Sequence, residues 1–174
     1  MESTIELIEA EIPRLRRYAR FLVGDADRAD DVVQECLTKA IAKVDSWQPG
    51  TNLRAWLFVI LRNSYFNEMR RKSRSPIIDD ADSALVGTTP SNQDAHMALL
   101  DVRKAFLNLS DEHREVLLLI AIEGLPYEEA AGVIGVPIGT VRSRASRARQ
   151  ALRDAIDPDG EQKTGRAESG TIHG

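Results

Sequence analysis

The stretch that decides the fold runs from residue 125 to residue 153 and reads LPYEEAAGVIGVPIGTVRSRASRARQALR. Its first part predicts a short helix over 127–134, which the Gly-Val-Pro sequence at 135–137 ends. A second helix follows, and its apolar residues recur at helical spacing on one face. These residues are Val141, Ala145, Ala148 and Leu152.

The other face of this second helix is polar and cationic. It carries Arg142, Ser143, Ser146, Arg147 and Arg149. Two helices joined by a short turn, the second rich in arginine, are typical of a helix-turn-helix with a recognition helix. The segment therefore predicts DNA binding.

The charge of the whole chain hides two basic patches. The 174 residues carry a net charge of −4, but residues 62–74 and 138–153 are strongly cationic. The first patch holds Glu68 as its only acid, and the second holds none. Because the local field matters more than the sum, two separate nucleic-acid contacts are expected.

Several classes of protein are disfavoured by the sequence. No apolar run approaches the ~20 residues that cross a bilayer, and the acidic start MESTIELIEAE is unlike a signal peptide. The single Cys36 is expected to be a small core residue. We therefore expect a cytoplasmic protein with no membrane contact, no cofactor, no metal and no small-molecule substrate.

Helical periodicity fails at residues 75–92, where Pro, Gly, Ser, Thr and Asp accumulate. This segment predicts a flexible acidic linker between a domain at 1–74 and a domain at 93–156. The polar residues 157–174 are expected to be a disordered tail. The predicted fold class is all-α: two small helical domains joined by a linker, with the helix-turn-helix in the second.

In the first domain, Pro13 is expected to open a helix that Gly24 ends. The cleanest amphipathic pattern covers 29–44, and a loop is expected at 46–52. A long helix then runs from Leu53 into the basic run at 70–74.

In the second domain, residues 95–107 are expected to form a helix. Its predicted inward-facing residues are Leu99, Val102 and Phe106. Ser110 should cap the next helix, whose apolar end at 117–122 predicts burial before Gly124 stops it.

Three motifs occur in order along the chain: DDVVQE at 30–35, RAWL at 54–57 followed by Arg62-Asn63, and GTVRSRASRAR at 139–149. With them the chain resembles bacterial sigma factors of the extracytoplasmic-function (ECF) type, which keep the second and fourth regions of the sigma-70 family. The opening IPRLRRYARFLVGD resembles the alphaproteobacterial general-stress-response branch.

The resemblance implies a subunit that binds core RNA polymerase and directs promoter-specific initiation. It implies that the helix over 29–44 docks on the clamp helices of the largest polymerase subunit. The exposed polar stripe of that helix supplies the expected contacts, Asp31, Gln34 and Glu35.

The resemblance also implies that the 46–52 loop, with Trp47, holds a flipped base of the −10 element. Arg62 and Asn63 would contact the non-template strand, and Arg70 and Arg71 would hold phosphates. Other aromatic platforms offered by this segment are Phe58, Tyr65 and Phe66, whereas Trp56 is expected in the core.

The recognition helix would read the −35 element as duplex. The expected base readers are Arg142, Ser143, Ser146 and Arg147. Thr140 is expected to be structural or to contact a phosphate. The remaining arginines of the helix are expected to hold phosphates or to form intramolecular ion pairs; they are Arg144, Arg149 and Arg153.

An anti-sigma factor is a partner that the resemblance implies, and a stress regulon is the implied target. Three other functions remain as alternatives: a sigma-like protein that sequesters an anti-sigma factor, a plain helix-turn-helix regulator, and a metal-dependent nuclease. The nuclease would use Asp30, Asp31 and Glu35, but no helical histidine or phosphate-binding loop accompanies them.

Overall fold

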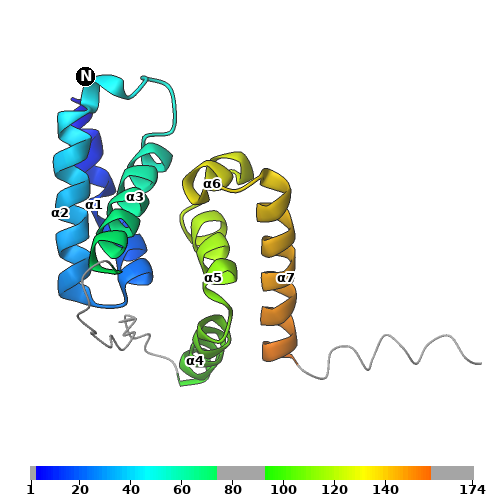
Figure 1. The fold of residues 1–174 in the computed structure, drawn as a ribbon. Helices are drawn as coiled ribbons and strands as arrows, with labels where there is room; N and C mark the ends of the chain where they lie inside the picture. Colours follow the sequence, from blue (N-terminus) through cyan, green and yellow to red (C-terminus); the bar gives the residue numbers. More distant parts are fainter. Residues whose placement is uncertain (1–2, 74–92, 158–174) are drawn as a thin grey trace, which may run out of the picture. The chain divides into compact units, whose positions relative to one another are not determined.

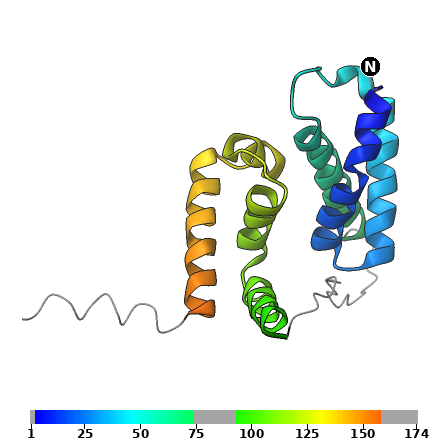
Figure 2. The ribbon, with the colours of Figure 1, turned by 180° about the vertical axis from the view of Figure 1, so that it is seen from behind.

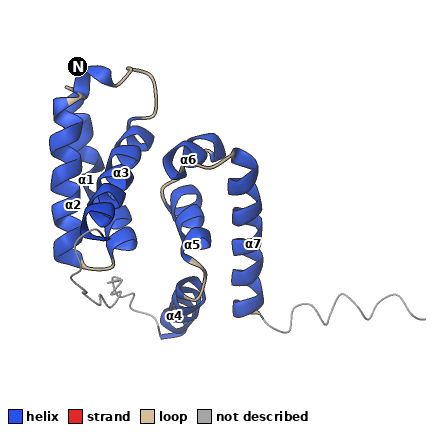
Figure 3. Ribbon diagram, in the orientation of Figure 1, coloured by secondary structure: helices blue, strands red, loops and turns tan. Residues whose placement is uncertain are grey.

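The computed structural model describes residues 3–73 and 93–157, and all regular structure in these ranges is helical (Figure 1, Figure 3). The elements are α1 (Thr4–Val23), α2 (Ala26–Ala42), the 3-10 turn η1 (Val44–Ser46), α3 (Leu53–Ser73), α4 (Gln93–Leu107), α5 (Asp111–Leu117), the π-helical turn η2 (Leu118–Ile122), α6 (Tyr127–Ile134) and α7 (Ile138–Ile156). The predicted all-α class is confirmed.

Helix α1 begins earlier than expected. Ser3 and Glu6 form a capping box: the Ser3 N–H donates to Glu6 Oε2 at 2.7 Å, and the Glu6 N–H donates to Ser3 Oγ at 3.3 Å. Pro13 therefore lies inside the helix, and the prediction that it opens the helix was wrong. Gly24 ends α1 as expected, because its φ of 78° is the left-handed conformation that glycine adopts readily.

Helices α1, α2 and α3 pack against one another around an apolar core (Figure 2). Phe58 is fully buried and lies 4.9 Å from the Tyr18 ring, centroid to centroid. It is a core residue, so its interpretation as an exposed base platform was wrong. Trp56, expected in the core, is half-buried, and Ile41 is exposed at the last turn of α2.

Cys36 belongs to this core, as predicted. Its thiol lies 3.5 Å from the Leu57 carbonyl oxygen, and burial raises its pKa to about 12. The pKa of the Cys36 thiol is thus higher in the folded protein than its usual value of about 8.5 in an unfolded chain. The contribution of the thiol to stability is therefore complete below about pH 8.5. The contribution is lost as the pH rises through about 12.

We expect Cys36 to resist iodoacetamide in the folded protein at pH 8, because almost none of the thiol is ionised there. The check is mass spectrometry of labelled protein against time, with the same reaction in urea as the control. Labelling of the folded chain as fast as the urea-unfolded chain would contradict the buried position.

By packing, the described helices fall into two units. The first unit contains α1, α2, α3, η1, η2, α6 and the start of α7. The second contains α4, α5 and the rest of α7. Within the first unit, α3 packs against α6, and η2 contacts α6. The predicted linker and, apart from Asp157, the predicted tail lie outside the described residues, so the domain boundaries stay predictions.

The second unit has its own small core, made of Leu109, Leu117 and Ala148 with Phe106 and Leu152 packed against it. Ser110 caps α5 as predicted, because its Oγ accepts from the His113 N–H at 3.4 Å. The predicted burial of Leu99 and Val102 was wrong: they are 48% and 40% exposed. An amphipathic stripe is buried only where a partner covers it, and Phe106 alone reaches the core.

The turn η2 contains a π-type hydrogen bond, from the Glu123 N–H to the Leu118 carbonyl oxygen at 2.9 Å. Leu118 and Leu119 are buried, but Ile122 is 49% exposed, so the expected burial of the whole 117–122 run holds only in part. Gly124 follows with a φ of 71° and ends the element, as predicted. No helix in the described ranges is long and apolar enough to cross a membrane.

Candidate nucleic-acid interface

The turn between α6 and α7 is fixed by its backbone. Gly135 adopts a left-handed φ of 79°, and its N–H donates to the Ala131 carbonyl oxygen at 2.8 Å. The Pro137 carbonyl then accepts from the Thr140 and Val141 N–H groups, which starts α7. Pro126 occupies the N-cap of α6 without a side-chain hydrogen bond, so the helix forms with an altered cap. The predicted helix-turn-helix boundaries are confirmed.

Helix α7 has one buried face and one exposed face. Its fully buried residues are Val141, Ala145 and Ala148. Four of its predicted base-reading residues, Arg142, Ser143, Ser146 and Arg147, are exposed, and Thr140 is half-buried. The helix therefore presents two arginines and two hydroxyls on the side away from its apolar stripe.

Two other arginines of α7 have intramolecular contacts. Arg144 forms an ion pair with Glu112 on α5, with 3.0 Å between Nη2 and Oε1. The Arg153 Nη2 donates to Gln150 Oε1 at 2.7 Å. Both thus have intramolecular partners, which confirms an ion pair as one role expected for Arg144.

The 46–52 loop is a compact turn before α3. The Thr51 N–H and hydroxyl donate to the Gln48 carbonyl oxygen at 3.1 and 2.7 Å, and Gly50 has a φ of 91°. Trp47 is half-buried, and its indole N–H is buried without an acceptor among the described residues. The loop thus holds an aromatic ring with an unused donor.

The half of α3 that follows Leu61 combines cations with half-buried aromatic rings. The Arg62 guanidinium lies over the Phe66 ring, 4.5 Å from its centroid, and Phe66 meets Tyr65 edge-on at 5.1 Å. Asn63 is exposed on the same helix, and Arg70 is exposed in its last turn. Such rings and cations suit a single-stranded nucleic acid.

The acidic stripe of α2 lies near the basic end of α3. Asp31 and Gln34 are exposed, and Glu35 is half-buried and paired with Lys39 at 2.6 Å. A surface hollow of about 530 Å³ is lined by Asp31, Glu35, Glu68, Arg71 and Lys72. The predicted polymerase-binding carboxylates and one predicted phosphate-binding arginine therefore line the same hollow.

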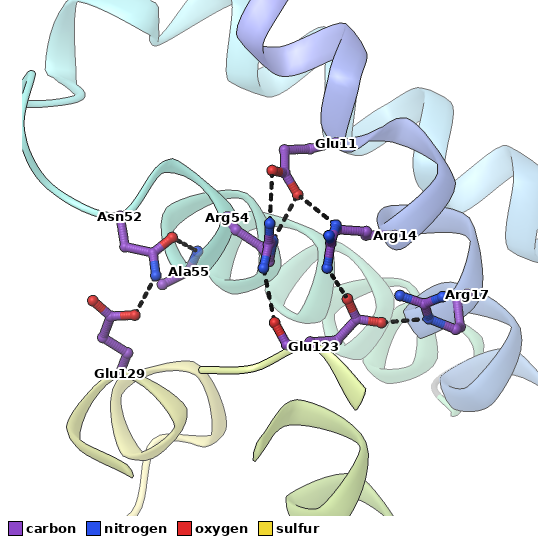
Figure 4. Close-up of polar contacts among 8 residues, drawn as sticks. All are labelled: Glu11, Arg14, Arg17, Asn52, Arg54, Ala55, Glu123 and Glu129. Atoms are coloured by element: carbon purple, nitrogen blue, oxygen red, sulfur yellow. Dashed lines mark hydrogen bonds and ion pairs between the residues drawn. The ribbon is translucent and has the colours of Figure 1, made fainter. Parts of the chain in front are cut away.

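A buried carboxylate holds a cluster of arginines elsewhere in the first unit (Figure 4). The Glu123 side chain is fully buried, and Arg17 Nε donates to its Oε1 at 2.5 Å. Arg14 lies 3.5 Å from the other carboxylate oxygen. Arg54 Nη1 donates to the Glu123 backbone carbonyl at 2.8 Å. We call these residues, with Glu11, the Glu123 cluster.

Arg54, the first residue of the RAWL motif, is the centre of a second pair. Its Nε and Nη2 donate to the Glu11 carboxylate at 2.8 and 3.1 Å. These hydrogen bonds raise the pKa of Arg54, and the bond to Glu123 raises the pKa of Arg17. Sequence reasoning missed this cluster. The available signal was a lone carboxylate closing the apolar run LLLIAIEG at 117–124.

Comparison with known proteins agrees with this arrangement. Residues 8–62 match the family described as the Sigma2 domain of PhyR, and residues 99–152 match Sigma-70, region 4. The chain is 43% identical to the ECF RNA polymerase sigma factor EcfG of Rhodopseudomonas palustris, over 94% of this chain and 91% of that protein.

Two solved structures are similar as well. One is the sigma factor RpoE in complex with the anti-sigma factor NepR from Bartonella quintana. It has a TM-score of 0.73 and 38% identity, over 90% of this chain and 98% of that one. The other is CnrH in complex with the cytosolic domain of CnrY, with a TM-score of 0.58 and 30% identity, over 88% and 87% of the two chains.

The chain belongs to the ECF sigma factors of the sigma-70 family. It is a subunit that binds core RNA polymerase and directs transcription initiation at promoters, and it is not an enzyme. The alternatives of a plain regulator and of a nuclease leave the first family match and the RAWL segment without a role.

Proposed function

We propose that α7 reads the −35 element through Arg142 and Arg147, aided by Ser143 and Ser146. The observation that carries this assignment is the division of α7 into a fully buried apolar face and an exposed cationic face. Arginine forms paired hydrogen bonds with guanine O6 and N7 in the major groove. Thr140, half-buried in the first turn, would contact a phosphate.

We propose that the 46–52 loop and α3 open the −10 element. Trp47 supplies a half-buried aromatic ring for an unstacked base. Arg62 and Asn63 then meet the non-template strand, and Arg70 and Arg71 hold its phosphates. The stacked Arg62 and Phe66 support this assignment, because base stacking needs a ring that is not wholly buried.

Asp31, Gln34 and Glu35 of α2 are the proposed contacts with core polymerase. Asp31 is exposed and Glu35 is half-buried beside Lys39, and surface carboxylates pair with basic residues of a partner and give orientation and a faster association rate. We expect Asp31→Asn to weaken binding to core polymerase by about tenfold, the equivalent of about 1.4 kcal/mol.

The measurement for Asp31 is a titration of labelled sigma factor with core enzyme. The matched control is Asp27→Asn, which removes an exposed aspartate from the first turn of the same helix. Equal affinities for both variants and the natural protein would remove Asp31 from the interface.

We further propose that an anti-sigma factor holds this protein inactive and that its promoters serve a stress response. Similarity to a sigma factor solved with NepR and to EcfG supports both statements. The protein would act in the cytoplasm, where core polymerase and the chromosome are found.

The experiment that tests the whole proposal is run-off transcription from fragmented DNA of the source genome, with purified core polymerase. Discrete start sites are expected only when the protein is added, and the shared sequences upstream of them define its −10 and −35 elements. Binding to core polymerase without any initiation would overturn the proposed promoter-reading residues.

A further inference from the structure

We propose that Glu123 and Glu129 form an acidic latch that keeps the unbound sigma factor in a closed state, and that promoter binding must release it. This inference rests on the proposed function for the location of the two DNA-reading surfaces. The contacts of the latch are those drawn in Figure 4.

The arginines and the carboxylates of the latch lie in the two regions of the chain that match different family models. Arg14, Arg17 and Arg54 lie within the match to the Sigma2 domain, whereas Glu123 and Glu129 lie within the match to region 4. The sequence separation between Arg17 and Glu123 is 106 residues. The latch therefore joins the two functional regions of the chain inside one packing unit.

The chemistry of the latch is polar and strong. A fully buried carboxylate is unfavourable unless it is paired, and Glu123 is paired with two arginines of α1: Arg17 donates to Oε1, and Arg14 lies 3.5 Å from Oε2, which accepts no hydrogen bond from the described residues. Arg54 of the neighbouring α3 donates to the Glu123 backbone carbonyl instead. Charge-assisted hydrogen bonds of this kind are roughly twice as strong as neutral ones. If the segments separate, Arg14 and Arg17, already 39% and 46% exposed, hydrate readily, so the closed state can open without unfolding.

Glu129 carries the latch to the proposed −10 surface. The Asn52 side chain ends the 46–52 loop: its Oδ1 accepts from the Ala55 N–H at 3.3 Å, and its Nδ2 donates to the Glu129 carboxylate. The carboxylate therefore lies at the edge of the loop that we propose to receive an unstacked base. A negative charge at this position opposes an approaching phosphate backbone.

Promoter geometry requires the latch to open. In the proposed function the −10 and −35 elements are two separate segments of the promoter, the first read by the 46–52 loop with α3 and the second by α7. In the closed state, residues of α3 and α6 lie within 8 Å of one another, Cα to Cα. The Asn52 side chain, which ends the proposed base-receiving loop, is bonded to Glu129 of α6 in this state, so a strand that enters the loop meets the Glu129 carboxylate. The free energy needed to open the latch thus lowers the affinity of the unbound sigma factor for a promoter.

The test measures closure by energy transfer between two dyes on the full chain. The dyes are attached at Gln48→Cys in the loop and at Glu128→Cys in the first turn of α6, both exposed positions. Cys36 does not compete for the dyes, because it is buried with a pKa of about 12.

We expect high transfer in the unbound protein and a loss of transfer when core polymerase and a promoter from the run-off experiment are added together. Glu123→Gln should lower the ratio of closed to open molecules by about 10- to 100-fold, which is the effect of losing a hydrogen bond to a charged group. Arg17→Gln removes the same ion pair through its partly exposed member, so it should also lower the ratio of closed to open molecules. Glu9→Gln, an exposed carboxylate on α1, makes the same charge change and should leave transfer unchanged.

Full transfer in Glu123→Gln and Arg17→Gln, or transfer that persists in the promoter complex, would overturn the latch. Low transfer in the unbound natural protein together with normal initiation would also overturn it, while the proposed function would stand. A loss of transfer in both variants without initiation by any of them would support the latch and refute the proposed promoter-reading function.

Discussion

Replacing both Arg142 and Arg147 with alanine is expected to abolish recognition of the −35 element. A good paired contact between arginine and guanine contributes about 1–3 kcal/mol of discrimination, which is about 5- to 150-fold for each residue. If the two contacts are independent, the double variant loses about 25-fold or more. The fold should survive, because both side chains are exposed and the apolar face of α7 is untouched.

The measurement is a competition between the promoter duplex and a scrambled duplex at fixed salt. Arg153→Ala is the matched control, since this exposed arginine near the end of α7 bonds Gln150. A residue that holds a phosphate should instead weaken both duplexes equally and reduce the salt dependence by about one charge. Equal weakening of both duplexes in the double variant would therefore reassign Arg142 and Arg147 to the backbone.

Phe58→Ala is expected to destabilise strongly the helical core of the first three helices. Phe58 is fully buried against Tyr18, and such a truncation costs about 3–5 kcal/mol. A domain of this size has about 5–15 kcal/mol of total stability, so the truncation removes a substantial part of it. Urea unfolding followed by circular dichroism measures the loss.

The control for Phe58 is Phe66→Ala on the same helix, where the ring is half-buried and the expected loss is about 1 kcal/mol. The two variants should thus differ in opposite ways: one mainly in stability and the other mainly in promoter opening. Phe66→Ala should keep most of its stability and open the −10 element poorly, whereas Phe58→Ala should lose several times more stability than Phe66→Ala. A folded Phe58→Ala protein with impaired opening would restore Phe58 as a base platform.

Local signals predicted the helix-turn-helix well. Gly135 and Pro137 impose the turn through their own backbones, and the apolar spacing of α7 describes a face that is buried in the structure. The start of α1 was also readable, because Ser3 and Glu6 have capping-box spacing, but Pro13 was preferred as the first residue. Such features depend on a few neighbouring residues.

Burial was predicted less well, because it depends on what packs against a helix. Phe58 follows Trp56 and Leu57, so apolar residues cover more than one face of α3, and the stripe did not decide which ring is inside. Leu99 and Val102 have the correct spacing, yet only the far end of α4 reaches a core. The sequence marks Glu123 as a lone carboxylate in an apolar run, but it does not indicate which arginines pair with it, since the pair with Arg17 joins charges 106 residues apart.

Because Glu123 directly follows the π-helical turn η2, the latch depends on the number of residues in that turn as well as on charge. A π turn holds one residue more than an α turn, and each residue of a helix rotates the next by about 100°. Deleting one residue from Leu118–Ile122 would turn Glu123 away from Arg14 and Arg17 without changing any charge. A sigma factor of this design could thus gain or lose its closed state through a single-codon insertion or deletion, with both DNA-reading surfaces left intact.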